Sequence, residues 1–336
     1  MNHTAAFIMP VKISGDETEL RFFREAVQGI KNQTDNDWII IMVEDYSDNK
    51  AVYDAIDEMK KVLKDKLHVI YSDKNYGTGA ARNKGVKYAN EIGAPFILFN
   101  DSDDISDPRR LELVRKAFEE DDTVNVVYTS FDVIDENDNV VPEYLVNKSV
   151  REILDGHKSN VVEGENALIK LVSTKRYTNL TSCTAVKTSL AYQEPFPGET
   201  VSEDSHTWLR YAAHPGKFVF LRDIKGRYRI CSNVHSRARS INANFYGQLF
   251  RVDSSGFEEA VKIAKKYGTM GEWGKKDLRV AFYVRLALSL LYGDSVEYCK
   301  KSLSLAMNIS KEKTFEYVDL LRCEPEYKAR MKAMVS

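Results

Sequence analysis

Hydrophobic and polar positions follow two different periods in roughly the first hundred residues of the chain. Short apolar runs have the length and residue types of buried strands, and they span Ala6–Met9, Trp38–Val43, Leu67–Tyr71 and Phe96–Phe99. Between these runs, apolar side chains recur three or four residues apart, which predicts helices at Glu19–Lys31, Ala51–Leu63 and Gly79–Ile92. A regular alternation of strand and helix predicts a parallel sheet with helical crossovers.

The pattern becomes less regular in the middle of the chain. Short apolar runs predict strands at Val126–Tyr128 and Phe131–Val133, and a helix is predicted at Gly164–Val172. Two further strands are predicted at Lys217–Leu221 and Gly226–Ile230. The stretch of residues 232–244 is rich in Ser, Asn and Arg. We interpret it as a flexible loop that becomes ordered over a bound diphosphate.

The last ninety or so residues have helical periodicity throughout. The helices predicted here span Phe257–Tyr267, Leu278–Tyr292, Val296–Met307 and Lys313–Leu321. Short linkers between them indicate antiparallel packed helices, and Leu286, Leu290 and Leu303 are expected in their core. We therefore divide the chain into an α/β domain of residues 1–244 and a helical region of residues 245–336. The helical region is expected to pack on its own domain, or to pair with a second copy.

Composition excludes several classes of protein. The formal net charge of the 336 residues is −2, so no overall basic field favours nucleic acid as a partner. The four cysteines form no C-x-x-C pair, which disfavours zinc and redox motifs. No signal-peptide pattern and no apolar run of about 18 residues is present. We expect a cytoplasmic protein, either free or peripheral at the inner face of the membrane.

An acidic cluster directly follows the strand predicted at Phe96–Phe99. It reads Asn100-Asp101-Ser102-Asp103-Asp104. Asp101 and Asp103 are two residues apart, so on an extended backbone their side chains point the same way. Hard carboxylates at the carboxyl edge of a sheet suit Mg²⁺ or Mn²⁺ carrying a diphosphate. The alternative is a solvated acidic turn.

Polar side chains also follow the second and third predicted strands. Asp45 could accept a hydrogen bond from the N3–H of uracil, whereas Asp48 could cap the next helix. After the third strand, Gly77 and Gly79 allow the backbone to approach a ligand closely. Arg82 on the following helix could bind a phosphate or a base, or it could be an ordinary surface residue.

Two later segments add candidate chemistry. Glu203 and Asp204 open a predicted helix, where a carboxylate could accept a proton from an acceptor hydroxyl or could simply cap the helix. Arg229 could bind a diphosphate, and His235 could ligate a metal or serve a structural role.

The order of these segments resembles that of family 2 glycosyltransferases of the GT-A fold. The similarity covers about residues 4 to 240, and its motifs are Met9-Pro10-Val11, Glu44-Asp45-Tyr46-Ser47, Asn75 through Gly85, Phe99 through Asp104, Glu203-Asp204 and Tyr228-Arg229. The resemblance implies a Rossmann-like α/β fold with a mostly parallel central sheet flanked by helices. To this the chain adds the α-helical C-terminal region.

What the resemblance implies about function is an inverting, metal-dependent transfer from a nucleotide-sugar donor, a UDP-sugar by similarity. Asp45 would read the base, and Arg82 would contact the nucleotide. Asp101 would hold the ribose or base side, and Asp103 would ligate Mn²⁺ or Mg²⁺. Asp204 would be the catalytic base. The acceptor would be a saccharide or a lipid-linked or protein-linked group.

Further positions follow from the same resemblance. Glu203 is the second candidate for the catalytic base, and the remaining donor-binding positions are Pro10, Asn75, Gly77 and Arg229. The chain departs from the family pattern at four positions: Glu44 and Tyr46 replace Asp and Gly, Asn100 replaces Leu, and Cys231 stands where the family commonly has a His. Either His235 takes its place as a metal ligand, or the metal has no protein imidazole. No Gln-x-x-Arg-Trp motif follows Asp204, which favours a single-addition enzyme over a processive synthase.

Three other classes of protein fit the sequence less well. A sugar nucleotidyltransferase would need a glycine-rich, basic loop right after the first strand, and Pro10 to Gly15 is not such a loop. A non-catalytic binding protein on a transferase fold is disfavoured by the intact Asp103 and Asp204. A nicotinamide-dependent oxidoreductase is disfavoured because the glycines follow the third strand, not the first.

Overall fold

The computed structural model describes residues 3–173, 179–230 and 244–335, which fold into two compact units. Unit 1 comprises Met1–Val146, Asn179–Asp204 and Phe218–Ser236. Unit 2 comprises Asn147–Thr178, Ser205–Lys217 and Arg237–Ser336.

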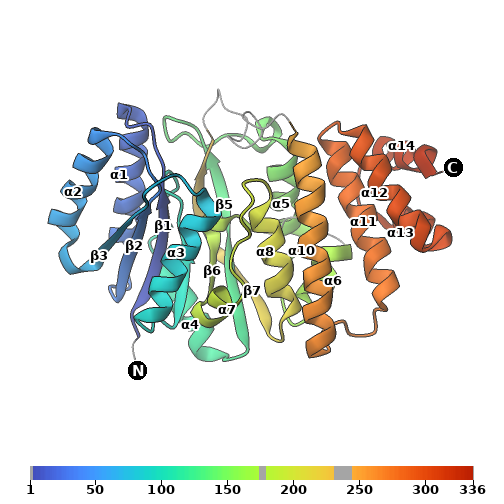
Figure 1. Ribbon diagram of the computed structural model, residues 1–336, viewed down its shortest axis with the longest axis horizontal. Coiled ribbons are helices and arrows are strands. Elements are labelled where there is room, and N and C mark those ends of the chain that lie inside the picture. The colour runs from blue at the N-terminus through green and yellow to red at the C-terminus, as the bar shows by residue number, and fades with distance from the viewer. Residues whose placement is uncertain (1–2, 174–178, 231–243, 336) are drawn as a thin grey trace. The chain divides into compact units, whose positions relative to one another are not determined.

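Unit 1 is built on a seven-stranded sheet with the order β3-β2-β1-β4-β6-β5-β7 (Figure 1). The strands are β1 (Ala5–Val11), β2 (Trp38–Glu44), β3 (Leu67–Tyr71), β4 (Phe96–Phe99), β5 (Val124–Ile134), β6 (Thr184–Lys187) and β7 (Lys217–Arg229). β1 pairs in parallel with β2 and β4, and β2 pairs in parallel with β3. β6 runs antiparallel to both β4 and β5. The predicted mostly parallel sheet is therefore confirmed.

Helices connect the strands of unit 1. They are α1 (Glu17–Lys31), α2 (Lys50–Leu63), α3 (Thr78–Glu91), α4 (Arg110–Glu120) and α7 (Thr188–Gln193), with 3₁₀ turns η1 (Lys64–Lys66), η2 (Glu143–Leu145) and η3 (Thr181–Cys183). Side-chain caps start two of them, because Asp16 accepts from the Glu19 N–H and Asn49 accepts from the Ala51 N–H. Asn49 thus caps α2, and the suggestion that Asp48 does so is wrong.

The parallel strands are covered on both faces, which explains their continuous apolar runs. Phe7 and Met9 of β1 pack into one core cluster with residues of α1, α2 and α4, such as Phe23 and Ile56. The opposite face receives α3. There a Cβ built on Gly85 would lie 2.7 Å from a methyl carbon of Ile8, so only glycine allows this close approach.

Unit 2 is helical. Its elements are α5 (Lys148–Ser159), α6 (Ala167–Ser173), most of α8 (Glu203–Ala213), α10 (Phe245–Tyr267), α11 (Lys275–Tyr292), α12 (Val296–Ile309), α13 (Lys311–Leu320) and α14 (Pro325–Val335). Leu286, Leu290 and Leu303 are buried, as expected. The rings of Phe257 and Phe282 stack with centroids 4.1 Å apart. None of the helices in the described part of the chain is long and apolar enough to cross a membrane.

Several predicted boundaries were wrong. The two strands predicted at Lys217–Leu221 and Gly226–Ile230 are one strand, β7, which continues through exposed charged residues such as Asp223 and Lys225. Likewise β5 runs without a break from Val124 to Ile134, and α10 begins at Phe245 instead of Phe257. In β7, exposed polar positions hid the continuity, because a strand at the edge of a sheet tolerates them.

Other predictions are not settled by these elements. The division at residue 244 stays a prediction, although segments 147–178 and 205–217, which we had counted with the α/β domain, belong to unit 2. The loop of residues 232–244 lies, except for its last residue, outside the described residues.

Candidate active site

Three polar segments predicted from the sequence meet at the carboxyl edge of the parallel strands of unit 1. Backbone hydrogen bonds hold two of these segments to β1. The Asp45 N–H donates to the Val11 carbonyl at 2.8 Å, and the Asn100 N–H donates to the Ile8 carbonyl at 3.0 Å. Pro10 lies buried in β1, opposite Val43 of β2. Ligands of open α/β folds bind at this edge of the sheet.

Asp45 holds the glycine-containing loop that precedes α3. Its buried carboxylate accepts from the Gly77 N–H at 2.7 Å and from the Tyr76 N–H at 3.1 Å. The side chain of Asn75 accepts from the same Gly77 N–H at 2.9 Å. Gly77 has a φ of +88°, a conformation that favours glycine. Since a carboxylate has about four acceptor positions, Asp45 can position the loop and still accept a bond from a ligand.

The turn after β2 departs from the family motif at Glu44 and Tyr46, and the structure explains one departure. Glu44 is buried, and its carboxylate accepts from the Ser47 N–H at 2.5 Å and the Tyr46 N–H at 3.3 Å. Glu44 therefore builds the turn. Tyr46 has a φ of +63°, in the left-handed region where the family has glycine, and its ring is 40 % exposed. Lys12 donates to its carbonyl.

Arg82 links residues from three of the predicted motifs. Its guanidinium, 4 % exposed, donates to Asp101 at 2.8 Å and to Glu203 at 3.2 Å. It also lies 5.3 Å from the centre of the Phe196 ring. Burial opposes the charge on Arg82, but the carboxylates of Asp101 and Glu203 raise its pKa above the ordinary value. The start of α8 is thereby tied to the acidic segment, which follows β4.

The acidic segment itself is held by internal hydrogen bonds. The side chain of Asn100 is fully buried and donates to the carbonyls of Asp101 and Asp104 at 2.9 and 3.0 Å. The buried carboxylate of Asp104 accepts from the Arg229 N–H at 2.9 Å, and its second oxygen has no partner among the described residues. Asn100, which replaces a Leu of the family motif, therefore braces the loop.

Negative charge is concentrated in this loop. The side chain of Asp103 reaches solvent, but the surrounding protein and the nearby charge of Asp101 raise its pKa to about 6. Burial, followed by the charges of Asp103 and Asp101, raises the pKa of Asp104 well above its usual range. Uncompensated carboxylates of this kind are stabilised by a cation.

Tyr228 and Asp204 belong to the same electrostatic environment. Burial raises the pKa of the Tyr228 hydroxyl, and the negative charges of Asp104, Asp103, Asp101 and Asp204 add to the shift. Asp204, the second residue of α8, also contributes to the raised pKa of Arg82. The predicted base therefore lies within electrostatic range of the acidic loop.

Sequence reasoning missed Ser182 as a member of the site. Its hydroxyl accepts from the Asp101 N–H at 2.9 Å, and Ser182 also lowers the pKa of the nearby Asp104 carboxylate, in part offsetting its burial. Ser182 lies in the turn η3 just before β6, where no motif marks it. The sequence pointed to Tyr228 only as the neighbour of Arg229, although the charges of the acidic loop act on its hydroxyl.

Arg229 and His235 were predicted to bind the diphosphate and the metal. The side chain of Arg229 is 1 % exposed, and its Nε donates to the carbonyl of Asp103 at 3.0 Å. It supports the acidic loop through protein contacts, and its contact with the donor stays a prediction. His235 lies outside the described residues.

The acidic loop offers carboxylates to a divalent cation. Within residues 3–173, 179–230 and 244–335, no group of three or more His, Cys, Asp or Glu side chains is placed so that it could hold a metal ion by itself. Mg²⁺ and Mn²⁺ sites with substrate phosphates commonly use one or two carboxylates, with water and phosphate oxygens filling the rest. The exposed Asp103 and the nearby Asp101 fit such a site, in which the protein supplies one or two carboxylates.

Solved structures show the same fold. Staphylococcus aureus TarS, residues 1–349, in complex with UDP superposes with a TM-score of 0.62 and 15 % identity, covering 99 % of this chain and 88 % of that one. The mannosyltransferase PcManGT of Pyrobaculum calidifontis, in complex with GDP-Man and Mn²⁺, gives a TM-score of 0.55 at 16 % identity, covering 100 % and 85 %. The fold of this chain is therefore GT-A.

The similar protein sequences are named as glycosyltransferases. An uncharacterized glycosyltransferase of Methanocaldococcus jannaschii is 28 % identical over 213 residues, which are 62 % of this chain and 66 % of that protein. One from Nostoc is 29 % identical over 123 residues, 37 % of this chain and 36 % of that protein. The chain thus spans less than two thirds of the length of either relative. The family model described as Glycosyl transferase family 2 matches residues 8–178, more than half of the chain. The chain therefore belongs to glycosyltransferase family 2.

Proposed function

We propose that the enzyme transfers a sugar from a UDP-sugar to an acceptor hydroxyl with inversion at the anomeric carbon, and that it requires Mn²⁺ or Mg²⁺. The observation that carries this proposal is the joining of four predicted motifs in unit 1. Arg82 pairs with Asp101 and Glu203, Asp45 holds the glycine loop, and the charge of Asp204 acts on both Arg82 and Tyr228.

The donor is proposed to lie along the carboxyl edge of β1, β2 and β4. Asp45 would accept from the base, next to Pro10, while Asn75 and Gly77 fix the adjoining loop. Asp101 and Arg82, already paired at 2.8 Å, would face the ribose and the nucleotide. Support for a nucleotide-sugar donor comes from the fold neighbours, since TarS was solved with UDP and with UDP-GlcNAc, and PcManGT with GDP-Man.

Asp103, with Asp101 beside it, would hold the cation, which when bound neutralises the charge that develops on the departing diphosphate. The like charges that raise the pKa of Asp103 and of Asp104 support this role, because a cation would relieve their repulsion.

The acceptor hydroxyl is proposed to give its proton to Asp204. The hydroxyl oxygen then forms its bond to the anomeric carbon while the bond from that carbon to the diphosphate breaks on the opposite face. This single displacement inverts the configuration and releases UDP. We assign the base to Asp204, as the family resemblance implies, and propose that Glu203, paired with Arg82 at 3.2 Å, positions that arginine. A saccharide or a lipid-linked or protein-linked hydroxyl is the proposed acceptor.

A panel of nucleotide sugars tests this function. Purified enzyme is incubated with UDP-, GDP- and dTDP-sugars in Mn²⁺ or Mg²⁺, and release of the nucleoside diphosphate is measured with and without a chelator. We expect UDP release from at least one UDP-sugar, lost on chelation and restored by added metal. Release of GDP or dTDP alone would refute the uracil assignment, and release that persists in chelator would refute the metal requirement.

A further inference from the structure

Four charged side chains of unit 1 form a closed ring behind the acidic loop. Arg21 pairs with Glu25 at 2.7 Å, and Glu25 pairs with Arg229 at 2.8 Å. Arg229 pairs with Asp138, and Asp138 pairs with Arg21 at 3.4 Å. Positive and negative groups therefore alternate around the ring. Arg21 and Glu25 come from α1, Asp138 from the turn after β5, and Arg229 from the end of β7.

Arg229 is the buried member of the ring. Its side chain is 1 % exposed, against 27 % for Glu25, 36 % for Asp138 and 41 % for Arg21. The guanidinium also lies 4.1 Å from the centre of the Phe22 ring. A buried cation that loses its partner is strongly destabilised. The position of Arg229 therefore depends on the carboxylates of Glu25 and Asp138.

Arg229 in turn holds both residues that follow Ser102. Its Nε donates to the Asp103 carbonyl at 3.0 Å, and its backbone N–H donates to the Asp104 carboxylate at 2.9 Å. The neighbouring Ile105 and Arg227 exchange both of their backbone hydrogen bonds, at 3.0 and 2.9 Å. Movement of the end of β7 would therefore move the backbone that carries Asp103.

The other side of the ring rests on a locally built turn. The carboxylate of Asp135 accepts from the N–H groups of Asn137 and Asn139 at 2.8 and 2.9 Å. Asp138 has a φ of +65°, and Arg21 donates to the Glu136 carbonyl. The Nη1 of Arg229 donates to the Asp135 carbonyl at 3.1 Å. This turn gives the ring a fixed support.

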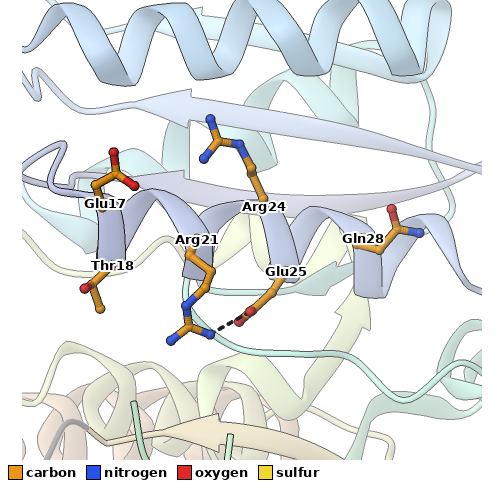
Figure 2. Close-up of a pocket in the computed structure, with 6 residues that line it drawn as sticks. All are labelled: Glu17, Thr18, Arg21, Arg24, Glu25 and Gln28. Carbon is orange, nitrogen blue, oxygen red and sulfur yellow. Dashed lines mark hydrogen bonds and ion pairs between the residues drawn. The ribbon is translucent and has the colours of Figure 1, made fainter. Parts of the chain in front are cut away.

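The outer part of the ring borders an open hollow on α1. The hollow has a volume of about 540 Å³ and is lined by Glu17, Thr18, Arg21, Arg24, Glu25 and Gln28 (Figure 2). Figure 2 shows the Arg21–Glu25 pair extending from the helix surface. None of these lining residues belongs to the proposed donor site, so a substitution of Arg21 or Glu25 changes the ring and leaves the donor-binding side chains in place.

We propose that Arg21, Glu25 and Asp138 are positioning residues for the metal site, acting through Arg229 on Asp103 and Asp104. This inference rests on the proposed function, since it assigns cation binding to the acidic loop. Residues around the direct ligands of metal sites typically change affinity by roughly 10–100-fold when they are removed. The ring would set the affinity for the cation without touching it.

The test compares Glu25→Gln with Glu58→Gln. Glu58 lies on α2 and pairs at 3.3 Å with Arg24 of α1, the helix that also carries Glu25. Because Glu58 is well exposed and outside the ring, its variant is a matched control. Both proteins are titrated with Mn²⁺, alone and with UDP, by calorimetry. We expect the Kd for Mn²⁺ to rise by roughly 10-fold or more in Glu25→Gln and to stay at the wild-type value in Glu58→Gln. Asp138→Asn serves as the second ring variant if Glu25→Gln does not fold.

Amide hydrogen exchange of the metal-free proteins gives an independent readout. We expect faster exchange at the amides of Ile105 and Arg229 in the ring variants than in the control. If the wild type binds no Mn²⁺, the metal part of the proposed function fails, and the exchange rates alone decide whether the ring holds the loop. Wild-type Mn²⁺ affinity together with wild-type exchange in a folded ring variant would overturn the inference.

Discussion

At the scale of single residues, Asp103 shows how a functional site can cost stability. Its carboxylate lies in a loop with Asp101 and Asp104, and the surrounding protein and the charge of Asp101 raise its pKa to about 6. A raised pKa means that the folded protein binds this proton more tightly than the unfolded chain does. Ionised Asp103 therefore destabilises the metal-free fold above about pH 6, and this cost declines as the pH falls toward the ordinary value of 3.8.

Asp103→Asn should separate stability from function. In chelator at pH 8 we expect the variant to unfold a few degrees above the wild type, because one repelling charge is gone, and the difference should shrink at pH 5. The same variant should lose Mn²⁺-dependent UDP binding. Thermal unfolding at the two pH values and calorimetry measure the two effects. A lower unfolding temperature at pH 8 would contradict the electrostatic account.

Asp204→Asn tests the assignment of the base. The amide cannot accept the proton, so turnover should fall by about 10²–10⁴-fold, while UDP–Mn²⁺ binding stays near the wild-type value. Glu203→Gln is the comparison, since Glu203 pairs with Arg82. We expect it to weaken donor binding more than it slows turnover at saturating donor. Near-normal turnover in Asp204→Asn would mean that Asp204 only caps α8.

Tyr46 carries local strain that glycine would remove. Its φ is +63°, and a left-handed conformation costs an ordinary residue roughly 1–2 kcal/mol. Tyr46→Gly should therefore raise the free energy of unfolding by about 1 kcal/mol after the entropy cost of glycine. Tyr76→Gly is the matched control, because Tyr76 is equally exposed but not left-handed, and it should lose stability. Urea unfolding of both variants gives the comparison.

At the scale of elements, contact between α3 and β1 depends on Gly85. Alanine is favoured over glycine within a helix by about 1 kcal/mol, but here its Cβ would lie 2.7 Å from a methyl carbon of the buried Ile8. Overpacking costs about 1–3 kcal/mol. Gly85→Ala should thus destabilise the protein. Gly198→Ala, where nothing lies within 4 Å, should be near neutral. Denaturant midpoints of the two variants decide, and equal midpoints would refute the packing argument.

The parallel half of the sheet could be predicted because its strands are buried on both faces and read as apolar runs. β6 could not, because Thr184–Lys187 is only four residues long and has no distinctive pattern. β7 was split in two because its exposed face carries Asp223, Lys225 and Arg227. Edge strands and short inserted strands depend on tertiary pairing, which one sequence does not display.

The site was predictable where a residue stands within a motif at a strand end, as Asp45 and Asp101 do, or on the helix that follows, as Arg82 does. Side chains that bind these residues from elsewhere were not, and Ser182 and the ring around Arg229 are the examples. Their partners are distant in the sequence, so neither spacing nor residue type identifies them. The sequence pointed to Arg229 because of its charge, whereas the hydrogen bond from its Nε to the Asp103 carbonyl shows that it supports the acidic loop.

At the scale of the whole molecule, the chain returns several times to each unit. Unit 2 takes α5 and α6 from the middle of the chain and α10 to α14 from its end. In α11, residues on most sides are buried, and α6 packs against it with Leu168 and Leu171 buried. The helices of unit 2 therefore share one core and should fold together.

Truncation after residue 244 should expose that core. The remaining α5 and α6 would lose the helices that cover their apolar residues. We expect the truncated chain to be aggregation-prone, while full-length protein remains in solution. Size-exclusion chromatography and light scattering distinguish the two. A soluble, folded truncated chain that binds UDP would show that the division at residue 244 is a true domain boundary.

The central claim is that this family 2 glycosyltransferase binds a uridine nucleotide through a divalent cation held by the acidic loop. Calorimetric titration of UDP into wild-type enzyme and Asp103→Ala, each with Mn²⁺ and with chelator, tests it most directly. The account predicts saturable UDP binding in the wild type with Mn²⁺, and loss of that binding both in chelator and in Asp103→Ala. UDP affinity that is the same in all four titrations would contradict it.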